Sequence, residues 1–85
     1  MSKEDQFKDA QERVKTLTKR PSNDQLLELY SLFKQGSVGD AQGKRPGMLD
    51  IKGRAKFDAW MGRKGMSKEA AMDAYVALVN RLVDS

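Results

Sequence analysis

Apolar residues near the N-terminus recur at intervals of three and four positions, which places them on one face of a helix. The members of this stripe are Phe7, Ala10, Val14 and Leu17. We expect the helix to run from Ser2 to about Thr18, because Pro21 cannot continue a helix.

A second helical stripe follows Pro21. Ser22 with Gln25 three positions later forms a capping-box pattern, which predicts a helix that starts at Ser22. Its apolar face contains Leu26, Leu29, Tyr30 and Phe33. Gly36 is a natural stop, so we expect the helix to end there.

The second half of the chain predicts two more helices after a long glycine-rich loop over 36–49. Asp50 is a candidate N-cap for a third helix from Ile51 to about Lys64. The fourth is expected to start at Ser67 and to run close to the C-terminus. Its apolar stripe contains Met72, Tyr75, Val76, Val79, Leu82 and Val83.

Four amphipathic helices without a strand pattern predict an all-α fold, a four-helix bundle around a shared core. The whole chain, residues 1–85, is expected to form one domain. The long loop breaks a simple up-down-up-down order, because it can carry the chain along the length of the bundle. The turn Arg45-Pro46-Gly47 is expected to bring Met48 and Leu49 towards the core.

The composition favours binding over catalysis. The sequence has no cysteine and no histidine, which excludes disulfides, Cys/His zinc sites and Ser–His–Asp triads. A carboxylate or lysine enzyme stays open, but no carboxylates converge, so we expect no catalytic or metal site. There is neither a run of ~20 apolar residues nor a secretory signal pattern, so we expect a cytoplasmic protein without stable membrane insertion.

Positive charge is concentrated in the middle third of the chain. The net charge is +4, yet residues 34–64 alone contain eight Lys/Arg and three Asp, a balance of +5. Such a segment is either a solvated basic face or a site that attracts anionic ligands.

Two lysine patterns in this segment favour a ligand with phosphates. Lys34 falls within the apolar arc of the second helix beside Tyr30. Its stem could cover the core while its ammonium group reaches water. Alternatively, the ammonium group could be held in an aromatic recess that binds an anion. In the third helix, Lys56 belongs to a basic stripe bordered by Trp60. Cations that alternate with aromatic surface suit a ligand with both phosphates and a flat ring.

The middle of the chain resembles a known family. The segments LYSLFKQGSVGD and RPGMLDIKGRAKFDAW are similar to the acyl-CoA-binding protein family, and MSKEAAMDAYVALVNRLV resembles its last helix. The resemblance covers nearly the whole chain. It implies a four-helix bundle of up-down-down-up topology. It also implies a monomeric, non-enzymatic carrier that buffers medium- to long-chain acyl-CoA esters and needs no cofactor.

The resemblance also implies which residues bind the coenzyme A head group. The matching positions are Lys15, Tyr30, Phe33, Lys34, Lys56 and Tyr75. Lys56 matches a contact to the 3′-phosphate region, and Tyr75 matches a residue that lines the adenine site. Phe33 stands where the family commonly has tyrosine, and Phe57 where it commonly has tryptophan, which removes a hydroxyl and some aromatic area.

For the acyl chain we expect an apolar groove built from Leu26, Leu27, Met48 and Leu49. One rival class shares the basic middle third, namely a small basic helical nucleic-acid-binding module. The sequence lacks zinc-finger and RNP-like patterns, so no nucleic-acid partner is expected.

Overall fold

The computed structural model describes residues 2–84 and consists of four helices with no strand in that range. The helices are α1 (Lys3–Val14), α2 (Asn23–Ser37), α3 (Ile51–Met61) and α4 (Lys68–Asp84). All four predicted helices are therefore confirmed. Among the described residues, no helix combines the length and the apolar character needed to cross a membrane.

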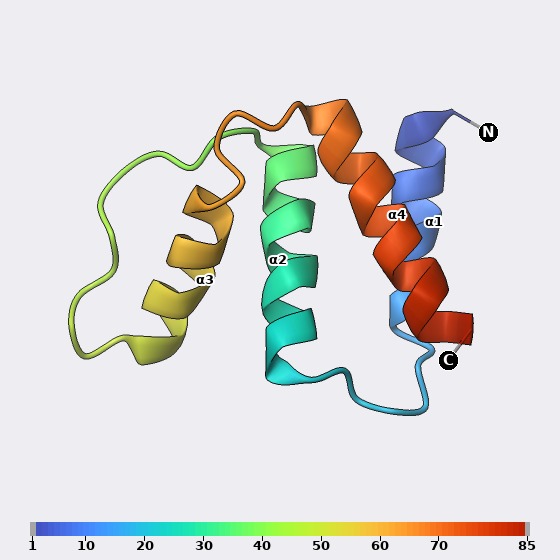
Figure 1. The fold of residues 1–85 in the computed structure, drawn as a ribbon, viewed down its shortest axis with the longest axis horizontal. Coiled ribbons are helices and arrows are strands. Elements are labelled where there is room, and N and C mark those ends of the chain that lie inside the picture. Colours follow the sequence, from blue (N-terminus) through green and yellow to red (C-terminus); the bar gives the residue numbers. More distant parts are fainter. Residues whose placement is uncertain (1, 85) are drawn as a thin grey trace.

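The helices lie side by side in the order α3, α2, α4, α1 (Figure 1). The chain runs down α1, up α2, up α3 and down α4, which is the expected up-down-down-up topology. The result is a flat molecule of 38 × 28 × 15 Å. The long loop runs around the outside of α3, and this path lets α3 lie parallel to α2.

The first and last helices lie next to each other and run in the same direction. The Lys3 ammonium lies 3.1 Å from the Asp73 carboxylate near one end. Near the other end, the Arg13 guanidinium donates to the side-chain oxygen of Asn80 at 2.6 Å. Residues that are far apart in the sequence therefore form this side of the molecule.

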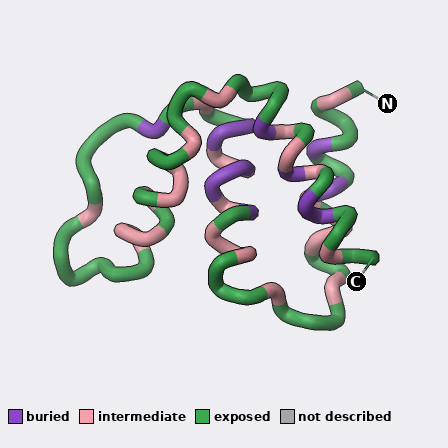
Figure 2. Tube along the Cα trace, viewed as in Figure 1, coloured by how far each residue is buried: buried purple, intermediate pink, exposed green. Residues whose placement is uncertain are grey.

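The core lies between α1, α2 and α4. It contains Phe7, Ala10, Leu29, Leu32, Ala71, Tyr75, Leu78 and Val79. Helix α3 contributes no buried residue, and among the helices it contacts α2 alone. Figure 2 shows the same division, because the buried helical positions all belong to α1, α2 and α4.

The predicted helix starts are confirmed by their caps. The Ser22 hydroxyl accepts the Gln25 N–H at 3.1 Å, and the Gln25 side chain accepts the Ser22 N–H at 2.9 Å. Before α3, the Asp50 carboxylate accepts the Gly53 N–H at 2.9 Å. The Ser67 hydroxyl accepts the Ala70 N–H at 3.0 Å. Local sequence signals therefore set the first turn of three helices.

The predicted helix ends are less accurate. Helix α1 ends at Val14 rather than near Thr18. Thr16 turns its hydroxyl back to the Arg13 carbonyl at 2.6 Å, and its N–H contacts the same carbonyl at 3.0 Å. This side chain competes with the regular helical hydrogen bonds and favours a tight turn. Helix α3 ends at Met61, three residues before the expected Lys64.

The expectation that Gly36 stops α2 is wrong, because the helix continues through it to Ser37. A Cβ atom at Gly36 would lie 3.1 Å from Cζ of Phe7 and 3.3 Å from Cγ of Met72. Glycine therefore serves close packing of α2 against its neighbours. The left-handed residue that follows the helix end is Gly39, with φ of 101°.

The expectation that Met48 and Leu49 point towards the core is also wrong. A turn does form there, since the Asp50 N–H donates to the Gly47 carbonyl at 3.0 Å. However, Met48 is 80% exposed and Leu49 is 99% exposed. The physical reason is that the core lies beyond α2, so there is no apolar layer at the start of α3 for these side chains to enter.

Candidate functional site

Two lysine–aromatic pairs connect α2 with α3. The Lys34 ammonium lies 5.0 Å from the centre of the Trp60 ring, and the Lys56 ammonium lies 5.3 Å from the centre of the Tyr30 ring. Each helix thus supplies one cation and one ring. Both distances are within the range of a cation–π interaction.

The spacing within each helix explains this reciprocal arrangement. Tyr30 and Lys34 are four residues apart on α2, and Lys56 and Trp60 are four residues apart on α3. Residues at this spacing share a helix face. Because α2 and α3 run in parallel, the Lys56–Tyr30 pair and the Lys34–Trp60 pair lie one helical turn apart. The result is a basic and aromatic surface that spans both helices.

Among the described residues, no carboxylate pairs with the lysines of this surface. The ion pairs within residues 2–84 are Lys3–Asp73, Arg13–Asp9, Lys15–Glu12 and Arg45–Asp58. In this part of the chain, neither Lys34 nor Lys56 pairs with a carboxylate. Two ammonium groups beside aromatic rings can therefore accept an external anion without first breaking an ion pair.

Three polar contacts fix α3 and its loop in place. The Trp60 indole N–H donates to the Gly39 carbonyl at 2.8 Å. The Arg63 guanidinium donates to the Ser31 hydroxyl at 3.1 Å. Arg45 forms a bidentate pair with Asp58, with distances of 3.0 and 2.6 Å. Trp60 thus holds the loop through one edge while its face meets Lys34.

A buried glutamine joins the end of α2 to the segment before α4. Gln35 is 1% exposed. Its side-chain NH₂ group donates to the Asp40 carboxylate and to the Met66 carbonyl, both at 2.8 Å. The same Asp40 oxygen accepts the Gly65 N–H at 2.9 Å. The hydrogen bond from Gly65 and, to a smaller extent, the one from Gln35 lower the pKa of Asp40. The carboxylate thereby ties the loop to the α3–α4 connection.

Phe33 and Tyr75 belong to an aromatic cluster with Phe7. The Phe7 and Tyr75 ring centres are 5.1 Å apart in an edge-on arrangement, and Phe33 lies 6.1 Å from Phe7 and 6.5 Å from Tyr75. Tyr75 is 5% exposed, and burial raises the pKa of its hydroxyl. This cluster packs α1, α2 and α4 together, and Phe33 is its half-buried member.

The remaining predicted head-group residue, Lys15, lies at the C-terminal end of α1. Its ammonium is 3.5 Å from the Glu12 carboxylate, and both side chains are mostly exposed. The described contacts do not join Lys15 to the lysine–aromatic pairs of α2 and α3. Its assignment to the same site stays a prediction.

The predicted acyl-groove residues fall into two groups. Leu26 and Leu27 are half-buried on α2, whereas Met48 and Leu49 are exposed before α3. Leu27 lines an open hollow of about 320 Å³ between α2 and α3, together with Ser31, Ala59 and Arg63. The groove as a whole stays a prediction.

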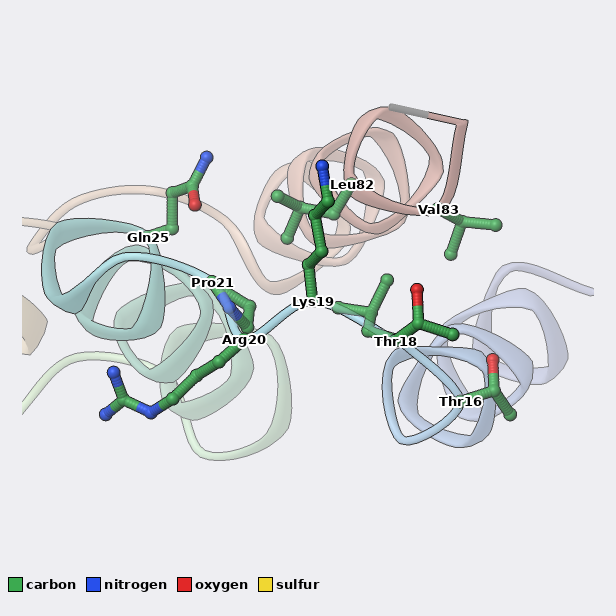
Figure 3. Close-up of a pocket in the computed structure, with 9 residues that line it drawn as sticks. Thr16, Thr18, Lys19, Arg20, Pro21, Gln25, Leu82 and Val83 are labelled. Carbon is green, nitrogen blue, oxygen red and sulfur yellow. The ribbon is translucent and has the colours of Figure 1, made fainter.

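A slightly larger pocket lies elsewhere and contains none of the predicted site residues. It measures about 350 Å³ and is formed by the α1–α2 loop and the end of α4 (Figure 3). Its lining residues are Thr16, Leu17, Thr18, Lys19, Arg20, Pro21, Gln25, Leu82 and Val83.

Within residues 2–84, no group of His, Cys, Asp or Glu could hold a metal ion.

Trp60 is the residue that the predicted site set missed. Its place beside the basic stripe of the third helix was visible in the sequence, but its partner Lys34 lies on another helix. Only the parallel alignment of α2 and α3 shows that the two side chains meet.

Comparison with known proteins decides the family. Residues 4–79 match the sequence model of the family described as acyl-CoA-binding protein. The chain belongs to the acyl-CoA-binding protein family. An acyl-CoA-binding protein homolog from Drosophila melanogaster is 56% identical over 79 residues, which cover 93% of this chain and 92% of the relative. The acyl-CoA-binding protein homolog 1 of Caenorhabditis elegans is 57% identical over 77 residues, 91% of this chain and 90% of the relative.

Solved structures of the family agree with the fold. The crystal structure of Oryza sativa acyl-CoA-binding protein 2 is similar with a TM-score of 0.92 and 40% identity, over 96% of this chain and 89% of that one. The crystal structure of the Moniliophthora perniciosa protein has a TM-score of 0.85 and 39% identity, over 100% of this chain and 86% of that one. The expected family and its all-α fold are therefore confirmed.

Proposed function

We propose that this chain binds medium- to long-chain acyl-CoA esters and carries or buffers them without chemical change. The observation that carries the proposal is the reciprocal placement of Lys34 over Trp60 and Lys56 over Tyr30. Coenzyme A offers what this surface suits, namely multiply charged phosphates and a flat adenine ring. The names of the fly and nematode relatives state that they bind acyl-CoA, which supports the same ligand class here.

The head group is assigned to the junction of α2 and α3. In our proposal, Lys34 and Lys56 approach the 3′-phosphate from two helices, and the Tyr30 hydroxyl donates a hydrogen bond. A phosphate would supply the counter-charge that both lysines lack within the described residues. Charge-assisted hydrogen bonds of this kind are about twice as strong as neutral ones.

The remaining predicted residues serve as supports of the head-group site. Phe33 and Tyr75 would present apolar ring surface towards the adenine, with Phe33 the more accessible of the two. Because Tyr75 is 5% exposed, it would contribute an edge rather than a full face. Lys15 would add a third cation by exchanging Glu12 for a phosphate oxygen.

The acyl chain is assigned to apolar side chains beside the head-group site. Leu26 and Leu27 on α2 would form one wall, and Met48 and Leu49 would form the other. An acyl chain would cover Met48 and Leu49, which are now 80% and 99% exposed. Burial of each CH₂ group contributes about 0.8 kcal/mol, so a long chain adds substantial affinity.

The proposed role needs no catalytic residue, metal or cofactor. We propose that the protein acts as a monomer, since three of its own helices enclose its core. We also propose a cytoplasmic location without a nucleic-acid partner. The absence of cysteine supports this location, because nothing in the fold depends on an oxidising compartment.

Calorimetric titration with acyl-CoA esters of increasing chain length tests the function. We expect affinity to rise with each added CH₂ by up to about fourfold, which corresponds to ~0.8 kcal/mol, while free coenzyme A binds weakly. A flat series would contradict the acyl groove. Binding of duplex DNA that falls steeply with salt, without binding of acyl-CoA, would favour the basic nucleic-acid module instead.

A further inference from the structure

A pocket at the α1–α2 loop takes no part in the proposed acyl-CoA site. It is the cavity of about 350 Å³ shown in Figure 3, and we name it the loop pocket. Gln25 in the first turn of α2 borders it, whereas Lys34 lies in the last turn of the same helix. The volume is within the range of ~300–1,000 Å³ that is typical of ligand sites. The loop pocket and the head-group site can therefore be occupied at the same time.

Apolar side chains from two distant parts of the chain contribute to the lining of the loop pocket. Leu17 and Pro21 come from the α1–α2 loop, and Leu82 and Val83 come from the end of α4. The first three are half-buried, and Val83 is 41% exposed. An aliphatic group that enters the pocket would cover this apolar surface and gain affinity from its burial.

The loop that carries this pocket is held at both ends. The Thr16 hydroxyl donates to the Arg13 carbonyl at 2.6 Å, directly after α1. Before α2, Ser22 and Gln25 cap each other through two hydrogen bonds. Because these contacts form the loop in advance, a ligand does not have to order it, and the entropic cost of binding is lower.

Positive charge borders the loop pocket without a carboxylate to balance it. Lys19 and Arg20 belong to the lining, which contains neither Asp nor Glu among the described residues. No ion pair within residues 2–84 includes either cation. The Arg20 guanidinium contacts the side-chain oxygen of Asn23 at 3.4 Å, which is long for a hydrogen bond. Both cations are therefore available to an anionic ligand.

The directions of the two cations select among anionic ligands. In Figure 3 the Lys19 side chain extends from the loop toward α4, and the Arg20 side chain extends to the opposite side of the loop. A compact anion such as phosphate cannot contact both, and a fatty acid has a single anionic end. An extended peptide with carboxylates on both sides of an aliphatic residue matches the cations and the apolar lining together.

We propose that the loop pocket docks an extended acidic segment of a partner protein. An aliphatic side chain of that segment enters the pocket against Leu17 and Val83. Carboxylates on either side of it pair with Lys19 and Arg20. This docking goes beyond the binding of acyl-CoA and does not depend on it, so it is tested both without ligand and with ligand bound.

NMR titration of the full chain with a short peptide tests the proposal. The probe is an acetylated, amidated pentapeptide with leucine at its centre and two aspartates on each side. We expect the backbone amide signals of Leu17, Lys19 and Val83 to shift as the peptide binds, and those of Lys34 and Lys56 to stay in place. Saturation with palmitoyl-CoA should leave the peptide affinity unchanged. A peptide with serine in place of leucine should bind about tenfold more weakly, because the apolar contact is lost.

Substitutions in the lining should weaken the binding of the leucine peptide. Val83→Ser should weaken it about fivefold, since this change removes apolar surface that the leucine would cover. Lys19→Gln and Arg20→Gln should each weaken it about two- to fivefold, which is the range of an exposed ion pair. Peptide affinity is measured from the same NMR titration.

Matched controls separate the loop pocket from general effects. Val38→Ser removes an exposed valine outside the pocket, and Lys44→Gln removes an exposed lysine of the basic middle third. Both should leave peptide binding unchanged. Circular dichroism should show full helix content in every variant, because none of the substituted residues belongs to the core.

Three results would overturn the pocket as a defined site. The first is the absence of shifts at Leu17, Lys19 and Val83 at millimolar peptide. The second is equal affinity for the leucine and serine peptides, which would mean attraction by charge alone. The third is an equal loss from Lys44→Gln and Lys19→Gln, which would mean a diffuse positive field.

Two further results would overturn the choice of occupant. Shifts of the pocket signals with decanoate but not with the peptide would identify an amphiphile with one anionic end. Displacement of the peptide by palmitoyl-CoA would make the pocket part of the acyl-CoA site. Failure of the wild type to bind acyl-CoA would contradict the proposed function and leave the peptide result standing.

Discussion

The two sides of α2 differ in how they hold their neighbours. On one side, α1 and α4 share with α2 a core of buried side chains that includes Phe7, Leu32 and Val79. On the other side, α3 has no buried residue and contacts no helix except α2. It is held by two lysine–aromatic pairs and by single hydrogen bonds such as that from Trp60 to Gly39.

This difference separates the part that stabilises the fold from the part that faces a ligand. Full burial of a large apolar side chain contributes about 1.5–3 kcal/mol. A hydrogen bond contributes about 1 kcal/mol net, and an exposed cation–π pair about 0.5–1 kcal/mol. We therefore expect α3 to be the helix that opens most easily. The proposed head-group site lies where this weakly held helix meets the stable one.

The largest expected effect comes from removing a core ring. Phe7→Ala should lower the free energy of unfolding by about 3–5 kcal/mol, because it leaves a cavity among α1, α2 and α4. Ile51→Ala on α3 is the matched change on the other side, and it should stay within about 0.5 kcal/mol. Urea denaturation measures both. Equal losses would mean that α3 contributes to the core as much as α1 does.

An intermediate effect is expected at the junction of the two sides. Lys34→Ala should weaken acyl-CoA binding by about 1.5–3 kcal/mol, since it removes a charge-assisted contact to phosphate. Its effect on the free energy of unfolding should not exceed ~1 kcal/mol, the contribution of its contact with Trp60. Calorimetry on Lys34→Ala and on the loop variant Lys44→Ala provides the comparison. Similar losses of affinity in both would indicate a diffuse positive field without a defined site.

The smallest effect concerns the carboxylate that ties the α2–α3 loop to the segment before α4. Hydrogen bonds from Gly65 and Gln35 lower the pKa of Asp40 from its ordinary value of 3.8. The lowered pKa means that Asp40 stabilises the fold above its ordinary pKa and that this contribution is lost as the pH falls through its folded-state value. Asp40→Asn keeps an acceptor oxygen and removes the titration.

Thermal unfolding of both proteins as the pH falls below about 4 checks this. The wild type should lose stability more steeply than Asp40→Asn. Parallel curves for the two proteins would show that the ionised form of Asp40 contributes nothing to the anchor.

Local features were predictable from the sequence because their partners lie within one turn. Ser22 and Gln25 cap each other, and Asp50 caps α3 through Gly53. Of the two lysine–aromatic pairs, the sequence predicts the spacing within each helix but not the contact between the helices. The four-residue spacing from Tyr30 to Lys34 was visible, whereas the alignment with α3 depends on the parallel path of the chain.

Other features could not be predicted because distant residues decide them. Gly36 has the sequence signature of a helix stop, yet Phe7 and Met72 make it a packing position. Gln35 would be placed on a polar face, but its amide reaches Asp40 and the Met66 carbonyl from inside the protein. Leu49 is a residue type typical of a core, but it is 99% exposed because the core lies on the other side of α2.

The pairing of α1 with α4 has a consequence for the time that the chain needs to fold. The contacts from Lys3 to Asp73 and from Arg13 to Asn80 span 70 and 67 positions of the sequence. Nearly the whole chain must therefore close into a loop before these helices can meet. Folding rates fall as the sequence separation of contacts grows. We expect this protein to fold more slowly than helical proteins whose neighbouring helices are joined by short turns.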